Sequence, residues 1–231
     1  KVVAVVGAAF KDLRPARLSF GHGEANFGVN RRRKAERGGA VSFVPNPQGA
    51  VDPEVPVLRV ESEEGQLRGV VFGYACHTST LLSDNYRFSG DYAGFAQEWL
   101  EQQHPDAVAF FVQGCGGDIM ASPRGTVELA RQYGETLAAR AAKVLGGSMR
   151  PVRGPLQCAF EVFPLAFGPP PSREELEARL QGKDTQSRRQ TIEFLRTSDA
   201  DLRRHAQELL KILDGGGNLP TEYPYPLQVW Q

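Results

Sequence analysis

Cysteine, net charge and long apolar runs are all scarce in this sequence. Its 231 residues include only three cysteines, an odd count without paired spacing, which predicts no disulfide framework and favours reduced thiols. Lysine plus arginine equals aspartate plus glutamate, so the formal net charge is zero and gives no bulk attraction to nucleic acid. No apolar run reaches the about 20 residues of a membrane-spanning helix, and no signal peptide is recognisable. We therefore expect no nucleic-acid partner and no transmembrane segment, and the oligomeric state stays open.

Several common catalytic signatures are also missing. The chain has no HxH, HExxH or paired CxxC motif, so no local motif supplies a zinc site. The phosphate-binding pattern GxxxxGK[ST] and the nucleophile pattern GxSxG are absent as well. The remaining composition, with 41% apolar and 23% charged residues, is ordinary for a globular protein with a substantial core.

Strand and helix patterns alternate along the chain, which predicts an α/β fold: a layered mixed β-sheet core flanked by helices, with a surface helical insertion. Residues 107–113, AVAFFVQ, form a continuous apolar run that is typical of a strand covered on both faces. Residues 22–54 are rich in glycine, asparagine, arginine and proline and predict a long ordered loop. The other predicted strands are 16–21, 57–61, 67–77 and 155–167, and the predicted helices are 1–13, 91–103 and 126–145.

The composition changes after three consecutive prolines. Ser172 and Glu175 have the spacing of a capping box, and three glycines from Gly215 end a charged helical segment. The stretch NLPTEYPYP, residues 218–226, predicts a loop. We expect residues 1–231 to be a single partial catalytic domain, with residues 170–217 as a helical insertion within it.

His77 ends the apolar run of the strand at 67–77. A lone histidine in this position is most often a structural residue, but side chains at the carboxyl ends of strands in α/β sheets converge on a crevice. The Ser89-Gly90-Asp91 stretch that follows is either a simple helix cap or one wall of a site near His77.

A glycine-rich segment, QGCGGD, follows the predicted strand at 107–113. Glycines allow close backbone approach to a ligand, and free N–H groups in such a loop bind oxyanions or phosphate. The alternatives are a tight strand-to-helix turn with Cys115 as a small buried residue, and an Asx turn at Asp118. Three arginines from Arg31 usually form a solvated face, although one guanidinium turned inward orients a carbonyl or carboxylate.

Four stretches in this order resemble the neutral/alkaline non-lysosomal ceramidase family. They are GVNRR (28–32), GYACHTSTL (73–81), SGDYAGFAQ (89–97) and FVQGCGGDI (111–119), within a resemblance that covers about residues 14–165. Family members are zinc-dependent amidases that hydrolyse the N-acyl bond of ceramide, which places them in sphingolipid metabolism. The resemblance thus implies Zn²⁺ as cofactor, an N-acyl or lipid small-molecule substrate, and a chain that is the middle of a longer catalytic domain. Relatives are often exported, which is compatible with a periplasmic or exported protein.

The family pattern carries over to individual residues. It implies that His77 is one of four metal ligands, the other three lying before Lys1 and after Gln231, and that Arg31 approaches the scissile amide, leaving Arg32 on the surface. Asp118 would order its loop or support His77. Met120 stands where the family's Gly-Asp-Val-Ser-Pro run has its catalytic serine, and Ser122 is displaced by two residues.

The glycine loop receives its role from the same resemblance. We expect its four residues to bind substrate through the backbone; they are Gly114, Cys115, Gly116 and Gly117. Two other readings stay open. One is a catalytically silent, ceramidase-like binding or scaffold module, suggested by Met120. The other is a cysteine hydrolase that uses Cys115 and His77.

Overall fold

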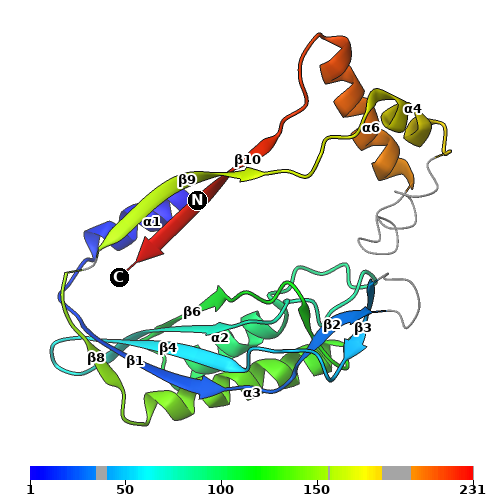
Figure 1. Ribbon diagram of the computed structural model, residues 1–231. Coiled ribbons are helices and arrows are strands. Elements are labelled where there is room, and N and C mark those ends of the chain that lie inside the picture. The colour runs from blue at the N-terminus through cyan, green and yellow to red at the C-terminus, as the bar shows by residue number, and fades with distance from the viewer. Residues whose placement is uncertain (35–40, 156, 184–198, 231) are drawn as a thin grey trace. The chain divides into compact units, whose positions relative to one another are not determined.

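A computed structural model describes residues 1–34, 41–155, 157–183 and 199–230 (Figure 1). The chain divides into two compact units. Residues 1–32 and 44–153 form the first unit, and residues 33–43 and 154–231 form the second. All residues that the sequence singles out for chemistry lie in the first unit.

The first unit is built on a five-stranded mixed sheet. Neighbouring strands are antiparallel except β5 and β6, which run parallel from the pairing of Gly69 with Val108 to that of Tyr74 with Gln113. The predicted pair of strands before His77 is confirmed as the β4–β5 hairpin, whose turn is closed by the Ser62 N–H and the Gln66 carbonyl. The strand order is β6 (Val108–Gln113), β5 (Leu67–Tyr74), β4 (Glu54–Glu61), β1 (Arg17–Glu24) and β8 (Arg150–Val152).

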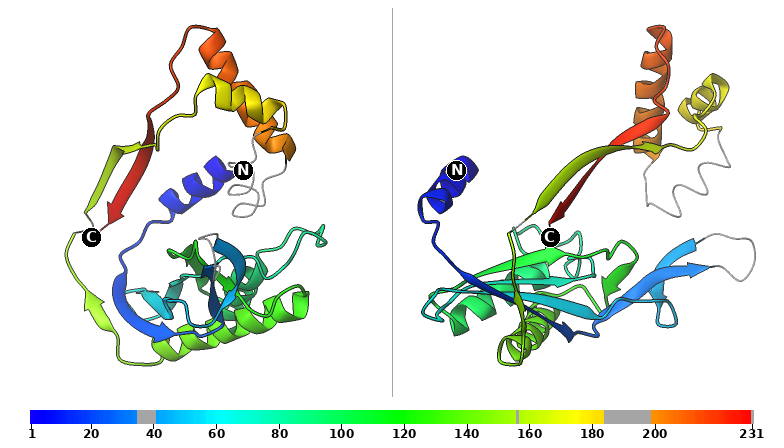
Figure 2. Two further views of the ribbon diagram at one scale, coloured as in Figure 1. Left: turned by 45° about the vertical axis from the view of Figure 1, so that its right-hand side comes forward. Right: turned by 60° about the vertical axis from the view of Figure 1, so that its left-hand side comes forward.

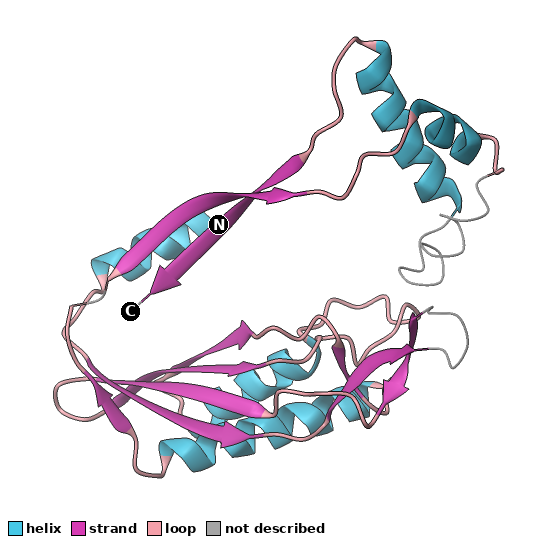
Figure 3. Ribbon diagram, viewed as in Figure 1, coloured by secondary structure: helices cyan, strands magenta, loops and turns pink. Residues whose placement is uncertain are grey.

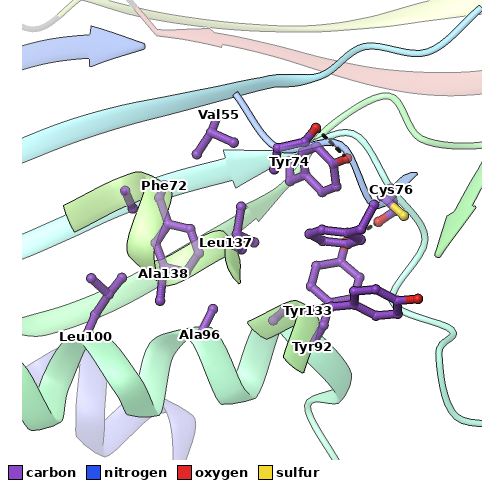
Figure 4. Close-up of a cluster of buried hydrophobic side chains, with 14 of the residues drawn as sticks. Val55, Phe72, Tyr74, Cys76, Tyr92, Ala96, Leu100, Tyr133, Leu137 and Ala138 are labelled. Atoms are coloured by element: carbon purple, nitrogen blue, oxygen red, sulfur yellow. Dashed lines mark hydrogen bonds between the residues drawn. The ribbon is translucent and has the colours of Figure 1, made fainter. Parts of the chain in front are cut away.

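Two helices cover one face of this sheet (Figure 2). They are α2 (Asp91–Gln103) and α3 (Val127–Leu145), both predicted, and Thr126 caps α3 through the Leu129 N–H. Gly134 makes their close contact possible, because a Cβ there would lie 2.6 Å from the Phe95 Cβ. Figure 4 shows the core between helices and sheet, in which Phe72 and Leu137 are almost fully buried.

The prediction that residues 107–113 are covered on both faces is wrong for the described residues. Ala109 points into the core and is 3% exposed, whereas Val108, Phe110 and Val112 are between 51% and 55% exposed. The reason is that α2 and α3, the two helices of the first unit that pack on this sheet, both cover the same face. An apolar run therefore identified the strand but not the number of covered faces.

The prediction of a long loop over residues 22–54 is also wrong. This region contains the end of β1 together with β2 (Gly28–Lys34), β3 (Val41–Asn46) and the start of β4. A second sheet has the order β3-β2-β7, where β7 (Ile119–Ala121) pairs antiparallel with β2 in the register Gly28 to Ala121. Polar and arginine side chains do not prevent a strand when a distant segment satisfies its backbone groups. Figure 3 shows β7 and the start of β2 paired at one end of the first unit.

The remaining elements lie at the chain ends. The predicted N-terminal helix is α1 (Val2–Lys11), none of whose residues is buried. The second unit contains β9 (Cys158–Ala166) and β10 (Glu222–Trp230), which form an antiparallel pair, and α4 (Arg173–Leu180) and α6 (Asp199–Asp214). The Ser172 capping box is confirmed at the start of α4.

The predicted loop at 218–226 is wrong from residue 222 onward, because β10 begins there. Pro224 and Pro226 are compatible with this strand, since it has one unpaired edge in the described structure. The interior of the predicted insertion, residues 184–198, lies outside the described residues. The assignment of 170–217 as an insertion within a single domain stays a prediction.

Candidate active site

His77 lies just beyond β5, where the two sheets meet. Its backbone N–H donates to the Ile119 carbonyl at 3.1 Å, and the residue forms an isolated parallel bridge with Met120. The residue is half-buried, so the ring is neither enclosed in the apolar core nor free in solvent. The pairing with β7 brings the carboxyl end of the main sheet against the small sheet that carries Arg31.

A backbone carbonyl determines which ring nitrogen of His77 is available. Nδ1 lies 2.8 Å from the carbonyl oxygen of Gly116. Because a carbonyl only accepts hydrogen bonds, this contact places the proton of the neutral ring on Nδ1 and leaves the lone pair on Nε2. Metal-binding histidines are commonly oriented in this way by a partner on the second ring nitrogen.

Gly116 reaches this position because it has no side chain. A Cβ there would lie 2.6 Å from both the Ala75 carbonyl carbon and the Cys76 nitrogen. The glycine is thus required for close packing against the chain between β5 and His77. This explains one glycine of the QGCGGD segment by protein packing, without any ligand.

Arg31 makes the second contact to the ring. Its backbone N–H donates to the Asp118 carbonyl at 2.7 Å, which anchors β2 to the glycine loop. Its Nη2 lies 3.2 Å from Nε2 of His77 and 2.9 Å from the Gly117 carbonyl oxygen. Burial, followed by the charges of Arg32 and Arg124, lowers the pKa of this guanidinium, which still remains protonated at physiological pH.

Arg32, for which we expected a surface position, is only partly exposed. Its Nη2 lies 3.3 Å from the same Gly117 carbonyl oxygen. Two guanidinium groups therefore converge on one side of the glycine loop. The sequence distinguished Arg31 from Arg32 only through the family resemblance, and the structure brings both to the site.

Asn30 connects the small sheet to the glycine loop, and sequence analysis assigned it no role. Its side chain is 6% exposed and its Nδ2 donates to Asp118 Oδ2 and to the Ala50 carbonyl, both at 2.9 Å. Its Oδ1 accepts from the Arg32 N–H at 2.8 Å. Of the two roles that the resemblance implies for Asp118, the geometry matches loop ordering, since the Gly116 carbonyl, and not Asp118, contacts the His77 ring.

The backbone N–H groups of the glycine loop differ in availability. The Gly114 N–H donates to the Tyr74 carbonyl at 3.0 Å, and the Gly116 N–H donates to the Gly114 carbonyl at 2.7 Å. These two groups are committed to the turn itself. Gly117 is exposed, and a Cβ there would meet nothing within 4 Å, so this is the open side of the loop.

The expectation that Cys115 is a small buried residue is wrong. Cys115 and Cys158 are exposed, and Cys76 is the buried cysteine. Burial raises the pKa of the Cys76 thiol to about 12, so this thiol is not an activated nucleophile. Cys115 is exposed because the turn directs the compact Gly116 against the strand end in its place.

Ser122 lies beyond the end of β7. The register of the small sheet places Met120 opposite Val29, and the Ser122 N–H faces the Phe27 carbonyl at 3.4 Å. Ser122 is thus two residues along the chain from the position that pairs with His77. The structure brings Met120, rather than Ser122, next to the His77 backbone.

Asp91 starts α2 in an unusual way. Gly90, within the Ser89-Gly90-Asp91 stretch, is the N-cap residue, and Asp91 is the first residue of the helix. Asp91 has φ +52°, is 6% exposed, and its carboxylate accepts hydrogen bonds from the Leu81 N–H at 2.8 Å and the Tyr92 N–H at 2.7 Å. It therefore fastens the segment after His77 to the start of the helix, a structural role.

Two buried tyrosines support the site from the core (Figure 4). The Tyr92 hydroxyl donates to the Cys76 carbonyl, and the Tyr74 hydroxyl donates to the Ala25 carbonyl at 2.9 Å. Burial raises the pKa of both hydroxyls, that of Tyr74 to about 12. The first bond holds the backbone directly before His77, and the second joins the end of β5 to the segment between β1 and β2. The polar role of these phenols is not visible in the apolar pattern of the sequence.

His77 has the chemistry of a metal ligand because its Nε2 carries the lone pair, while Nδ1 is held by the Gly116 carbonyl. It is one ligand, however, and the described residues contain no group of three or more His, Cys, Asp or Glu side chains that could hold a metal ion. The described part of the chain thus supplies a single candidate ligand.

No helix in the described part of the chain is long and apolar enough to cross a membrane.

Comparisons with known proteins point to one family. The chain is 30% identical over 140 residues to a neutral ceramidase of Mycobacterium tuberculosis, a match that covers 54% of this chain and 21% of the relative. It is 24% identical over 176 residues to a neutral ceramidase of Pseudomonas aeruginosa, covering 69% of this chain and 25% of the relative. No protein-family profile matches the chain.

Solved structures show the same fold. A crystal structure of the Pseudomonas aeruginosa neutral ceramidase aligns with all of this chain and 40% of its own, with a TM-score of 0.60 and 20% identity. A ceramidase complexed with C2 aligns with 73% of this chain and 28% of its own, with a TM-score of 0.55 and 22% identity. The chain is thus a distant relative of the neutral ceramidases over part of its length. It spans 21% and 25% of the two curated relatives.

Proposed function

We propose that this chain forms part of a ceramidase-like hydrolase that cleaves an N-acyl (amide) bond with the help of zinc. The observation that supports this most strongly is the contact between His77 and Arg31 in a distant relative of the neutral ceramidases. In hydrolysis, water adds to the carbonyl carbon and the C–N bond breaks, which yields a carboxylic acid and an amine.

His77 would hold the metal through Nε2, with its ring oriented by the Gly116 carbonyl. Zinc, when bound, supplies a Lewis acid for the amide carbonyl and activates water at neutral pH. The remaining ligands would come from other parts of the polypeptide. Asp118 and Asn30 keep the glycine loop and β2 in register, so that His77 and Arg31 face the same space.

Arg31 would stabilise the negative charge that develops on the carbonyl oxygen. Its guanidinium is charged and planar, and the Gly117 carbonyl and the His77 ring orient its Nη2 before the charge forms. Removing one such donor typically costs about 3–4 kcal/mol of transition-state stabilisation. The open side of the loop at Gly117 leaves room for the amide group beside this guanidinium.

The substrate class we propose is an N-acyl small molecule or lipid. Both curated relatives are named neutral ceramidases, and the solved relative is a ceramidase complexed with C2. Ser122 is our candidate for the family serine that is missing at Met120. Ser122→Ala tests this role, because activity equal to wild type would remove Ser122 from the catalytic set.

The deciding experiment uses the longest natural polypeptide that carries this sequence. Zinc content and hydrolysis of a panel of N-acyl substrates are measured for the wild type, His77→Ala and His205→Ala. His205 is exposed on α6 and serves as the matched control. We expect His77→Ala alone to lose metal and activity.

Wild-type zinc content in His77→Ala would reject the ligand assignment. A wild-type protein that binds zinc but hydrolyses no N-acyl substrate would favour a catalytically silent binding or scaffold module instead. Hydrolysis that persists after alkylation of Cys115 would exclude the cysteine-hydrolase reading, which the described contacts do not support.

A further inference from the structure

Two neighbouring residues at the start of α2 bind the backbone on both sides of the loop at residues 77–80. The hydroxyl of Tyr92, which is 0% exposed, donates to the Cys76 carbonyl directly before this loop. The carboxylate of Asp91, which is 6% exposed, accepts from the Leu81 N–H at 2.8 Å directly after it. One end of a single helix therefore holds both ends of the loop.

The backbone of Asp91 is strained. Its φ of +52° lies in the left-handed region, where glycine is the usual residue. Such a conformation persists only where surrounding contacts hold it, and strained residues are concentrated at functional sites. The contacts here are the bonds of the carboxylate to the Leu81 and Tyr92 N–H groups. The Asp91 N–H also donates to Ser89 Oγ at 3.0 Å. The two acceptor oxygens of the carboxylate explain why this position is not a glycine.

The loop at residues 77–80 receives little support from its own side-chain hydroxyls. The hydroxyl oxygens of Ser79 and Thr80 are buried and have no hydrogen-bond partner in the described part of the chain. Backbone bonds hold the loop instead: the His77 N–H donates to the Ile119 carbonyl at 3.1 Å, and the Thr80 carbonyl accepts from the Gly125 N–H at 2.8 Å. Its geometry therefore depends on the segments that bind its two ends.

We propose that Asp91 and Tyr92 are positioning residues, which together set the place of the His77 ring against the glycine loop. The contact of Nδ1 with the Gly116 carbonyl at 2.8 Å requires the backbone of His77 to be held accurately, and the Tyr92 bond lies one residue before it. The catalytic consequence of this inference rests on the proposed function. The placement of the ring does not.

A general loss of stability is the alternative explanation, and Tyr133 supplies the control for it. Its ring stacks on Phe27 with centroids 4.8 Å apart, and Phe27 also contacts the Tyr92 ring at 5.1 Å. The Tyr133 hydroxyl donates to the Pro123 carbonyl at 2.7 Å. Tyr133→Phe thus removes a hydroxyl from the same aromatic cluster and leaves the two bonds that flank the loop in place.

The test uses the longest natural polypeptide that carries this sequence, with ¹⁵N-labelled histidines. The variants are Tyr92→Phe, Asp91→Gly and the control Tyr133→Phe. Asp91→Gly removes the carboxylate but permits the same φ, so any effect comes from the lost hydrogen bonds. We expect the ring signals of His77 to shift or split in the first two variants and to match the wild type in Tyr133→Phe. The ring signals of His205 should stay unchanged in all three.

Kinetics give a second readout. For an N-acyl substrate that the wild type hydrolyses, kcat should fall about 10- to 100-fold in Tyr92→Phe and in Asp91→Gly, because the reacting groups are misplaced. KM should stay within about twofold, since no contact to the substrate is removed. The double variant should lose less activity than the product of the two single losses, because both residues hold one loop. Asp91→Asn keeps one acceptor oxygen and should retain more activity than Asp91→Gly.

Unchanged His77 signals in either Tyr92→Phe or Asp91→Gly would overturn the inference and leave the proposed function intact. Equal changes in Tyr133→Phe would overturn it as well, because general packing would then explain them. Should Asp91→Gly fail to fold, Asp91→Asn takes its place with the same expected change in the ring signals. A wild type that hydrolyses no N-acyl substrate would reject the proposed function, and the ring signals would still decide the positioning role.

Discussion

The side-chain amide of Asn30 lies 2.9 Å from the carboxylate of Asp118, 88 positions further along the chain. This bond joins β2 to the glycine loop and keeps Arg31 and Gly117 at hydrogen-bonding distance. Because Asn30 is only 6% exposed, its end of this part-buried bond is shielded from solvent, and the loss of the bond would leave polar atoms without partners. The geometry of the candidate site therefore depends on a residue that touches no reacting atom.

Replacing Asn30 with alanine should destabilise the fold by about 2–3 kcal/mol, because buried partners lose their hydrogen bonds. The measurement is urea unfolding followed by circular dichroism. Asn85→Ala is the matched control, since Asn85 makes one exposed bond to the Arg87 carbonyl and should cost less than about 0.5 kcal/mol. Equal losses in both variants would contradict the role assigned to Asn30.

The two adjacent glycines of the loop should respond differently to alanine. Gly116→Ala brings a Cβ to 2.6 Å from the backbone of Ala75, whereas Gly117→Ala meets nothing within 4 Å. We expect Gly116→Ala to lose about 1–3 kcal/mol or more of unfolding free energy, and Gly117→Ala to stay within about 0.5 kcal/mol of wild type. The free energies of unfolding of the two variants, measured in urea, show which glycine is required for packing in the folded chain and which position has room for a side chain. A tolerated Gly116→Ala would refute the steric account.

The three cysteines should differ in reactivity. Cys115 and Cys158 are exposed and Cys76 is buried with a raised thiol pKa. We expect iodoacetamide at about pH 8 to modify the first two within minutes and to leave Cys76 unmodified until the protein unfolds. Peptide mass spectrometry, with and without urea, measures the extent of alkylation at each cysteine. Rapid labelling of Cys76 in the folded protein would contradict its burial.

Alkaline pH should weaken the fold partly through Tyr74. An unfolded tyrosine titrates near about pH 10, and burial raises the pKa of Tyr74 to about 12 in the folded chain. A group with a raised pKa contributes its stability fully below the unfolded pKa and loses it as the pH rises through the folded pKa. The contribution of Tyr74 therefore disappears between about pH 10 and 12.

The matched variant is Tyr74→Phe, which lacks the hydroxyl that donates to Ala25 and accepts from the Gly28 N–H. We expect it to be about 1–3 kcal/mol less stable than wild type at neutral pH. This difference should shrink as the pH rises above about 10. Denaturant unfolding at several pH values gives the difference, and a gap that widened with pH would disprove the assigned direction.

Much of the fold was predictable from local patterns. The β4–β5 hairpin, both helices over the sheet and the capping box at Ser172 follow from apolar periodicity and capping residues, which act within a few positions. The placement of His77 at the end of a strand followed in the same way. These features are local, so neighbouring residues are sufficient to specify them.

Strand pairing over residues 22–54 was not predictable, because β2 gains its hydrogen bonds from β7, which is distant in sequence. The exposed face of β6 was missed for a related reason: an apolar run records that a strand is buried, not how many layers cover it. Cys115 was misplaced because its exposure depends on how Gly116 packs against Ala75.

By itself, the sequence determined the α/β class, the main helices and the residue types that could do chemistry. Only the tertiary structure decided which nitrogen of His77 carries the lone pair, which arginine contacts that nitrogen, and that Asn30 binds Asp118. The physical reason is that propensity and periodicity act along the chain, whereas hydrogen-bond partners and steric limits depend on backbone segments brought together from far apart in sequence.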